Sequence, residues 1–206
     1  EPEAKVEQHF SLEVDGVSVH GTADHYVDSI ISDFKVTSAW KYVSGDFAEW
    51  EKQLNIYAYL MRGELPVKQL QIIAIFRDWS AMNALRSQDY PPQPIMVIPI
   101  KLWDEQAQYE YLAERVKIHE QAKDYSDEKL PECSDKDRWY TGTKWAVMKK
   151  GNKRAAKLHD NAQDAHTHAS QAGNLYVQVR QGENKRCDKY CPVASHCKQY
   201  DRLKRT

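Results

Sequence analysis

Alternating apolar and polar residues on both sides of Asp15-Gly16 constrain the fold of this chain more than any other feature. The segment HFSLEVDGVSVH, residues 9–20, alternates with period two before and after that pair. Such alternation places one set of side chains on one face of a β-strand, and an Asp-Gly pair favours a two-residue hairpin turn. The segment therefore predicts a β-hairpin with one buried face.

The rest of the first 130 residues predicts further strands and helices. In chain order these are a strand with an inner turn near Asp28-Ser29 (25–36), a helix with one apolar stripe (44–63), a largely apolar strand (67–79), a strand after a Pro-rich loop (88–103), and a long helix (104–125). The order β-β-β-α-β-β-α predicts an α/β fold, a mixed sheet flanked by helices. At 206 residues we expect a single domain, residues 1–206, with its core over about residues 7–130.

Residues 131–206 differ in character from this core. Residues 131–155 are expected to be loop-like, residues 153–173 helical, and residues 174–182 a late strand. Charge also changes here: residues 1–137 hold 14 Lys and Arg against 25 Asp and Glu, net −11, whereas residues 138–206 hold 15 against 5, net +10. A basic segment favours a polyanionic partner, and an acidic one favours metal ligands or solvated helices.

The sequence offers no candidate membrane segment. It contains no apolar run of about 18 residues, and no signal peptide is visible at its start. We therefore expect no membrane partner and a cytoplasmic location. Because the chain opens on Glu1 rather than Met, we also expect a fragment or a processed product.

Two carboxylates and a lysine lie close together in GTADHYVDSIISDFK, residues 21–35. Strand periodicity places Asp33 and Lys35 on one face, with Phe34 pointing into the core and Asp24 beside them on the neighbouring arm. Two carboxylates and the Phe34 carbonyl are hard oxygen ligands that suit Mg²⁺ or Mn²⁺. A lysine beside such a site can hold an activated water and stabilise charge on a phosphate.

Gln53 and Tyr57 follow on the predicted helix, where i, i+4 spacing puts them on one face. Each is an ordinary helix residue by itself, and Asp-x-Lys at a strand end is common. The ordered combination of G-x-x-D, D-x-K and Q-x-x-x-Y is more specific than any of its parts.

This combination resembles the PD-(D/E)XK nuclease superfamily, in particular its RecB-like branch, which includes CRISPR-associated and phage exonucleases. GTAD, SDFKVTS and QLNIYAYL are similar to successive motifs of that branch, over about residues 7–103. The resemblance implies a restriction-endonuclease-like fold in which Asp24, Asp33 and the Phe34 carbonyl bind metal. It also implies that Lys35 assists the attacking water, while Gln53 and Tyr57 position the substrate and the site.

The family often supplies a further histidine ligand from a helix upstream of the first strand. The present chain starts too late to contain that helix, so we expect either a longer native protein or a less complete metal shell. Structural or solvated roles are expected for His9, His20 and His25, and at most weak contributions for Glu7 and Glu13.

Four cysteines predict a bound metal or cluster. Cys133 lies in LPECSD, and RCDKYCPVASHC holds Cys187, Cys191 and Cys197 in a C-x3-C-x5-C pattern. In a reducing compartment, clustered cysteines favour a metal over disulfides, and four thiolates suit an iron–sulfur cluster or tetrahedral Zn²⁺. The pattern resembles the iron–sulfur staple of some RecB-like nucleases, although there the first cysteine precedes the core. We expect [4Fe–4S], with Zn²⁺ as the alternative.

The segment DRWYTGTKWAVMKKGNKRAAK, residues 137–157, combines cations with aromatic rings. Cations suit phosphates and rings suit unpaired bases, although the rings could instead cover the cluster while the lysines are merely exposed. The predicted DNA-binding residues are Lys144, Lys149, Lys150, Lys153, Arg154, Trp139, Tyr140 and Trp145. Because the segment lies between Cys133 and Cys187, a cluster would fasten both of its ends.

Together these patterns favour a metal-dependent DNA exonuclease acting on single strands or duplex ends. By resemblance, phage or bacterial recombination, repair or processing fits, as does CRISPR adaptation, with a protein partner from one of these systems. Two alternatives stay open: a DNA-binding or interaction protein on a nuclease fold with weak or no catalysis, and a zinc-stapled structural domain of a larger recombination machine. Cleavage polarity, strand preference, exo versus endo action and oligomeric state are not determined by the sequence.

Overall fold

The computed structural model describes residues 3–204, and the chain divides into two compact units, residues 1–121 and 122–206. This division falls near the change of character expected around residue 130. That the whole chain forms a single nuclease domain stays a prediction.

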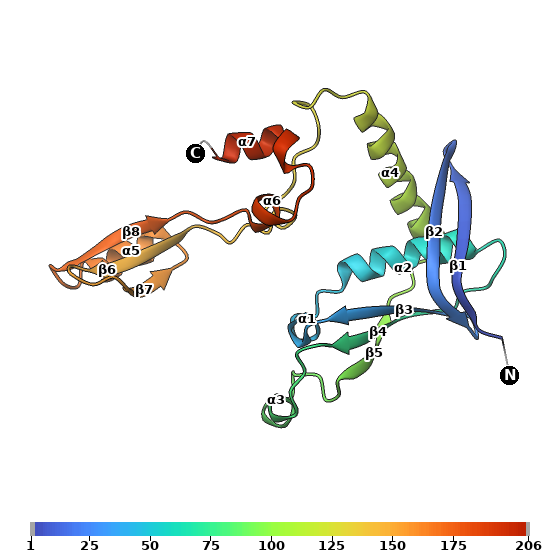
Figure 1. The fold of residues 1–206 in the computed structure, drawn as a ribbon, viewed down its shortest axis with the longest axis horizontal. Helices are drawn as coiled ribbons and strands as arrows, with labels where there is room; N and C mark the ends of the chain where they lie inside the picture. The colour runs from blue at the N-terminus through green and yellow to red at the C-terminus, as the bar shows by residue number, and fades with distance from the viewer. Residues whose placement is uncertain (1–2, 205–206) are drawn as a thin grey trace. The chain divides into compact units, whose positions relative to one another are not determined.

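A five-stranded mixed sheet frames the first unit (Figure 1). Across the sheet the strands follow chain order: β1 (Lys5–Val14), β2 (Val17–Val27), β3 (Ile30–Thr37), β4 (Gln69–Phe76) and β5 (Ile95–Ile100). All neighbours are antiparallel except β3 and β4, which run parallel because their connection crosses over through helices. The expected mixed α/β sheet is confirmed.

Two tight turns join β1, β2 and β3. Asp15 and Gly16 have φ of 49° and 79°, and Asp28 and Ser29 have φ of 51° and 66°. Positive φ at both central residues is typical of type I′ turns, whose twist matches that of paired strands. Both turns lie where the sequence predicts them.

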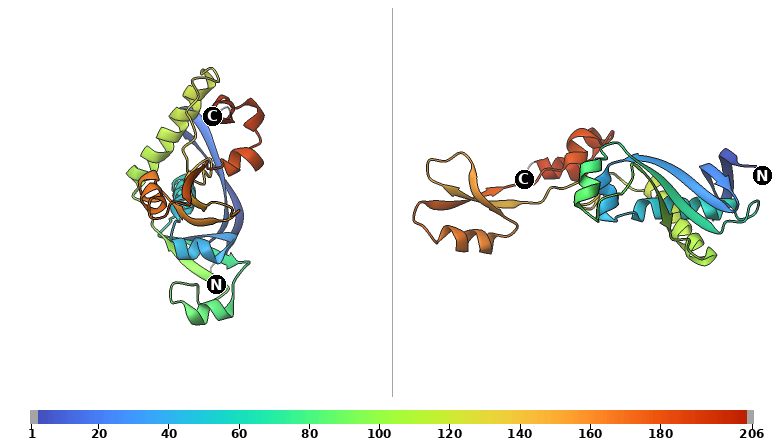
Figure 2. Two further views of the ribbon diagram at one scale, coloured as in Figure 1. Left: turned by 90° about the vertical axis from the view of Figure 1, so that its left-hand side faces the viewer. Right: turned by 90° about the horizontal axis from the view of Figure 1, so that it is seen from below.

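Helix α2 (Ala48–Met61) covers one face of this sheet (Figure 2). Its buried residues Leu54 and Met61 pack in one core with strand residues such as Ile31 and Ile72. Burial of these apolar side chains supplies most of the free energy that stabilises the packing of α2 on the sheet. The helix ends two residues before Gly63, close to the expected stop.

The long helix α4 (Glu105–Lys123) packs beside α2 and the hairpin of β1 and β2. Leu112 and Val116 of α4 form a second cluster with Val14 and Tyr59. Asp104 caps the helix by accepting the Ala107 N–H at 2.8 Å, as the sequence predicts.

The sequence did not predict two short helices, α1 (Ala39–Ser44) and α3 (Ala81–Arg86). Helix α1 ends at Gly45, whose φ of 62° breaks the expected helix of residues 44–63 and delays its start to Ala48.

The prediction that Phe34 points into the core is wrong. Its side chain is 50% exposed, and Val36, Ile95 and Val97 on the same face are exposed as well. Helix α2 covers the opposite face, which carries Ile31, so strand alternation turns Phe34 outward.

The second unit contains a three-stranded antiparallel sheet in the order β7 (Ala155–His159), β6 (Lys144–Lys149), β8 (Leu175–Arg180), with helix α5 (Ala162–Ala169) on one face (Figures 1 and 2). The expected late strand is confirmed as β8. The expectations of a loop over residues 131–155 and a helix over residues 153–173 are wrong in part, because β6 lies within the first range and β7 within the second, where α5 covers only the later part.

The remainder of the second unit consists of short elements. These are α6 (Lys185–Lys189), the 3-10 turn η1 (Ala194–His196) and α7 (Lys198–Lys204). The two segments that lead into and out of the small sheet run side by side, since Tyr140 and Asn184 form a β-bridge. Among residues 3–204, no helix is both long and apolar enough to span a bilayer.

Candidate metal centre and nucleic-acid surface

Strands β2 and β3 separate where the two predicted acidic ligands lie. Their backbone pairing covers only residues 25–27 and 30–32, and Asp24 and Asp33 would be the next pair. Instead, the Phe34 N–H donates to Asp24 Oδ2 at 3.0 Å. The Asp24 side chain thus takes the place of the next backbone hydrogen bond between the two strands. Both carboxylates lie at the point where the strands diverge.

Asp33 is 1% exposed, and its charge partner is Lys35, whose Nζ lies 2.7 Å from Asp33 Oδ2. Burial raises the pKa of Asp33, the lysine opposes that rise, and the charge of Asp24 adds to it. Apart from the lysine contact, this buried oxygen has no hydrogen-bond partner among the described residues. The structure therefore brings Asp24, Asp33 and Lys35 together, as the sequence predicts.

The donor set at this point fits a divalent cation. The charged form of Asp33 is disfavoured because the carboxylate is buried and lies beside that of Asp24. A cation bound to both carboxylates would offset this free-energy cost. One oxygen of Asp24 is committed to the Phe34 amide, which fixes the orientation of that carboxylate.

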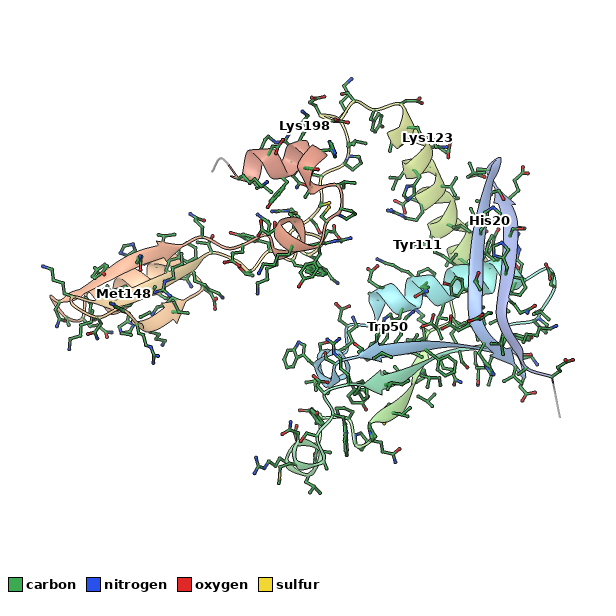
Figure 3. The ribbon with its side chains drawn as sticks, viewed as in Figure 1. His20, Trp50, Tyr111, Lys123, Met148 and Lys198 are labelled. Carbon is green, nitrogen blue, oxygen red and sulfur yellow. The ribbon has the colours of Figure 1, made fainter. Side chains whose placement is uncertain are left out.

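Gln53 and Tyr57 are linked on α2, where Gln53 Nε2 donates to the Tyr57 hydroxyl at 2.8 Å. Neither side chain forms a hydrogen bond with Asp24, Asp33 or Lys35 among the described residues. Both are half-buried on α2, which passes over β3. The N-terminal half of α2 also carries Trp50 (Figure 3). The expected i, i+4 pairing is confirmed, and direct contact with the acidic pair is not observed.

Gly21 sets the approach of α2 to β2, a role that sequence reasoning missed. A Cβ at Gly21 would lie 2.9 Å from Leu60 Cδ1 and 3.0 Å from Tyr57 Cε1, closer than side chains pack. Gly21 precedes Asp24 by three residues, so this contact ties Tyr57 to the strand of the acidic site. A glycine in the interior of a predicted strand was the available signal.

The other residues considered near this site form no hydrogen bond or ion pair with Asp24, Asp33 or Lys35 among the described residues. The rings of His9 and His20 stack at 5.5 Å on the β1–β2 hairpin, and the His25 ring meets the outward-facing Phe34 ring at 6.4 Å. Glu7 of β1 falls between the register pairs Val6–His25 and Gln8–Ala23, opposite Asp24 of β2, and it is exposed with φ of 50°. His25 Nδ1 is buried without a hydrogen-bond partner among the described residues, and the structural or solvated roles expected for the three histidines stay predictions.

The four cysteines share one neighbourhood in the second unit, and none of them forms a disulfide. Burial raises the pKa of the Cys187 thiol, and charges on Cys191, Cys133 and Cys197 raise it further. As they stand, no three His, Cys, Asp or Glu side chains within residues 3–204 are grouped closely enough to hold a metal ion. The sulfurs are therefore near one another without having the spacing of ligands on one ion.

Hydrogen bonds fasten this cysteine region at both ends. The Cys133 N–H donates to Gln199 Oε1 at 2.9 Å, and Gln199 Nε2 donates back to the Cys133 carbonyl at 2.8 Å. The Tyr200 N–H reaches Cys197 Sγ at 3.4 Å. An N–H directed at a sulfur stabilises negative charge on that sulfur, and the metal or cluster expected at these cysteines stays a prediction.

The predicted DNA-binding cations divide into two sets. Lys149, Lys150, Lys153 and Arg154 lie exposed at the turn between β6 and β7, and none pairs with a carboxylate among the described residues. Lys144, at the other end of β6, forms an ion pair with Asp160 that lowers the pKa of that acid.

The three predicted aromatic residues do not join these cations in one surface. The Trp139 ring packs against Tyr190 at 5.3 Å, in the cysteine region. The Tyr140 ring covers Gly182, where a Cβ would lie 2.5 Å from it. Trp145 pairs with His159 of β7 and so lies on the face of the sheet that α5 covers.

No family model matches this chain, and no curated protein matches it. Among solved structures, the crystal structure of SSO0001 aligns with a TM-score of 0.38 and 17% identity over 56% of this chain and 50% of that protein. A crystal structure of a proposed exonuclease from Eubacterium rectale aligns with a TM-score of 0.37 and 15% identity, over 55% of this chain and 42% of that protein. The chain spans about half the length of these neighbours or less. Because the likeness is so distant, the function is inferred from the geometry of the site.

Proposed function

We propose that this chain is a Mg²⁺- or Mn²⁺-dependent deoxyribonuclease of the RecB-like PD-(D/E)XK type, acting as an exonuclease. The observation that supports it most strongly is the meeting of Asp24, Asp33 and Lys35 where β2 and β3 diverge. Two carboxylates that can hold a metal, with one cation for a phosphate or water, can catalyse phosphodiester hydrolysis.

A divalent cation bound here would polarise the phosphate and acidify a water. Asp24, Asp33 and the Phe34 carbonyl would hold it. Lys35 is 28% exposed at its side chain, so its ammonium can donate to a water while it stays beside Asp33, and can stabilise negative charge on a phosphate oxygen. The Gln53–Tyr57 pair offers hydrogen-bonding groups from α2 to orient the substrate.

The same proposal assigns Cys133, Cys187, Cys191 and Cys197 to a [4Fe–4S] cluster, with Zn²⁺ as the alternative. Such a centre would supply a covalent fastening between the segment before the small sheet and the segment after it. The proposed substrate is DNA, as single strands or duplex ends, in a bacterial or phage-infected cytoplasm. A partner protein from recombination or CRISPR adaptation belongs to the same proposal.

The test is cleavage of end-labelled single-stranded and double-stranded DNA with Mg²⁺ or Mn²⁺, and with EDTA as the metal-free control. Asp33→Asn should lower the rate by on the order of a hundredfold or more, because it removes a charged metal ligand. Asp28→Asn, at the exposed turn between β2 and β3, is the matched control and should cut at the wild-type rate. Cleavage by Asp33→Asn at the wild-type rate would disprove the proposed site.

A DNA-binding protein without catalysis is the second candidate. The close Asp33–Lys35 contact and the raised pKa of Asp33 favour it, because a lysine already neutralises part of the charge that a metal would meet. Metal-independent binding of DNA with no cleavage in Mg²⁺ or Mn²⁺ would select this candidate.

A further inference from the structure

The small sheet of the second unit has one face that α5 does not cover. His159 Nε2 lies 3.0 Å from His168 Nδ1 of α5, which places the side chain of His159 on the covered face. Strand register puts Trp145 with His159, and alternation puts the neighbouring positions on the other face. This open face consists of Lys144, Ala146, Met148, Leu158, Tyr176, Gln178 and Arg180.

The open face presents an aromatic ring, an apolar side chain and a guanidinium. Tyr176 is 47% exposed and Leu158 is 51% exposed. Arg180 Nη2 reaches Met148 Sδ at 3.6 Å, so the guanidinium lies over the central strand (Met148 is labelled in Figure 3). Tyr176 is paired with Met148 on the same face. The Tyr176 ring and the Arg180 guanidinium therefore both lie beside the buried Met148 side chain, so the open face presents an aromatic ring with a cation near it.

The charges around this sheet are strongly biased. Residues 143–181 hold seven Lys and Arg against two Asp and Glu. Both acids are engaged: Asp160 pairs with Lys144, and Asp164 accepts the side-chain N–H of Asn161 at 2.8 Å. The four turn cations, Lys149, Lys150, Lys153 and Arg154, have no carboxylate partner among the described residues. A polyanion would therefore meet uncompensated positive charge at the β6–β7 end of the sheet.

We propose that this open face binds single-stranded nucleic acid, with Tyr176 stacking on a base and Arg180 and the four turn cations contacting phosphates. An exposed ring on a sheet can stack only on a base that is not enclosed in a duplex. Neither Tyr176 nor Arg180 was predicted from the sequence. The surface goes beyond the proposed nuclease, because its binding requires neither Asp24, Asp33 nor a metal.

Binding is measured on the full chain in EDTA, by fluorescence anisotropy of a labelled oligo-dT and a labelled oligo-U. Tyr176→Ala should weaken binding to the preferred strand about tenfold, because one base loses its stacking partner. Tyr176→Phe retains the ring and should bind as the wild type does. Tyr125→Ala is the matched control, since that tyrosine is 42% exposed in the same unit and outside the open face.

Wild-type affinity of Tyr176→Ala for both strands would overturn the proposal, as would a loss in Tyr176→Phe equal to that in Tyr176→Ala. A duplex of the same length that binds as tightly and depends equally on Tyr176 would also overturn it, because stacking would then not be the mode of contact.

The turn cations are tested through salt dependence. Replacing all four, Lys149, Lys150, Lys153 and Arg154, with Gln should flatten the slope of log K against log salt by about 3, since each phosphate contact on a single strand contributes about 0.7. The control substitutes Lys68 and Lys117, exposed lysines of the first unit, with Gln and should leave the slope unchanged. An unchanged slope in the fourfold variant would contradict the assignment of these cations.

The two proposals fail separately. If Asp33→Asn cuts DNA normally while Tyr176→Ala loses affinity, the nuclease site is wrong and the binding surface stands. If Tyr176→Ala binds as the wild type does while cleavage requires Asp33, the binding surface is wrong and the nuclease site stands.

Discussion

Asp33 combines near-complete burial with a charge partner in Lys35, and burial still raises its pKa above the ordinary carboxyl value of 3.8. Because the folded-state pKa is raised, the protonated form favours the native state. That contribution is fully present below the unfolded pKa and is lost as pH rises through the folded pKa. At neutral pH, therefore, the ionised Asp33 lowers the free energy of unfolding unless a cation is bound.

The corresponding prediction concerns thermal stability. Asp33→Asn should melt at a higher temperature than the wild type at neutral pH, and the difference should shrink as pH falls toward 4 and below. Mn²⁺ should raise the melting temperature of the wild type and not that of the variant, because only the native wild-type site gains a bound cation. Differential scanning fluorimetry across pH checks this, with Asp28→Asn as control. A variant that melts below the wild type at neutral pH would contradict the burial argument.

Gly21 carries the second residue-scale prediction. Gly21→Ala should destabilise the protein by about 1–3 kcal/mol, because the added methyl overpacks against Leu60 and Tyr57. It should also slow cleavage, since displacing Tyr57 disturbs its bond to Gln53. Gly63→Ala is the control, because nothing lies within 4 Å of the added atom there. Equal stability of the two variants in urea unfolding would show that the contact is not close in solution.

Among the elements, α6, η1 and α7 depend most on the proposed cluster, because they carry or adjoin Cys187, Cys191 and Cys197. Cys187→Ser should abolish the visible absorbance of anaerobically purified protein and lower its melting temperature. His196→Ala, beside Cys197 and exposed, should leave both unchanged. A colourless wild type with one zinc per chain would replace the cluster with the Zn²⁺ alternative.

The proposed centre at the cysteines should lose its metal on acidification. The pKa of the Cys187 thiol is raised by burial and by the other cysteines, so protons compete strongly with a metal for that sulfur. Metal retention should therefore fall as pH falls. Absorbance followed during acidification measures it, and a cluster that is lost only on alkalisation would contradict this assignment.

The sequence predicts β1 to β5, α2 and α4 well because each has a long apolar period bounded by turn or cap residues. It misses β6 because lysines at both ends hide a short apolar centre, and it assigns the residues of β7 to a helix. It misses α1 and α3 because helices this short lack a full apolar stripe. The meeting of Asp24, Asp33 and Lys35 follows from the hairpin and strand period. The outward direction of Phe34 and the close contact of Gly21 with Tyr57 depend on which face α2 covers, and a single-sequence pattern does not specify that.

At the scale of the whole molecule, the chain divides into units of residues 1–121 and 122–206, and each has its own buried core. Leu54 belongs to the first and Val147 to the second, and both are completely buried. We expect two thermal transitions. Leu54→Ala should destabilise only one of them, by about 2–5 kcal/mol, and Val147→Ala only the other. Calorimetry that shows one transition, shifted by both substitutions, would contradict independent cores.

The central claim is that Asp24 and Asp33 hold a divalent cation where β2 and β3 diverge. Anomalous diffraction from a crystal of the full chain grown with Mn²⁺ tests it most directly. The expected result is an anomalous peak within about 2.0–2.6 Å of a carboxylate oxygen from each of these residues. Saturating Mn²⁺ with no peak between these two carboxylates, in crystals of a protein that cuts DNA in solution, would contradict it.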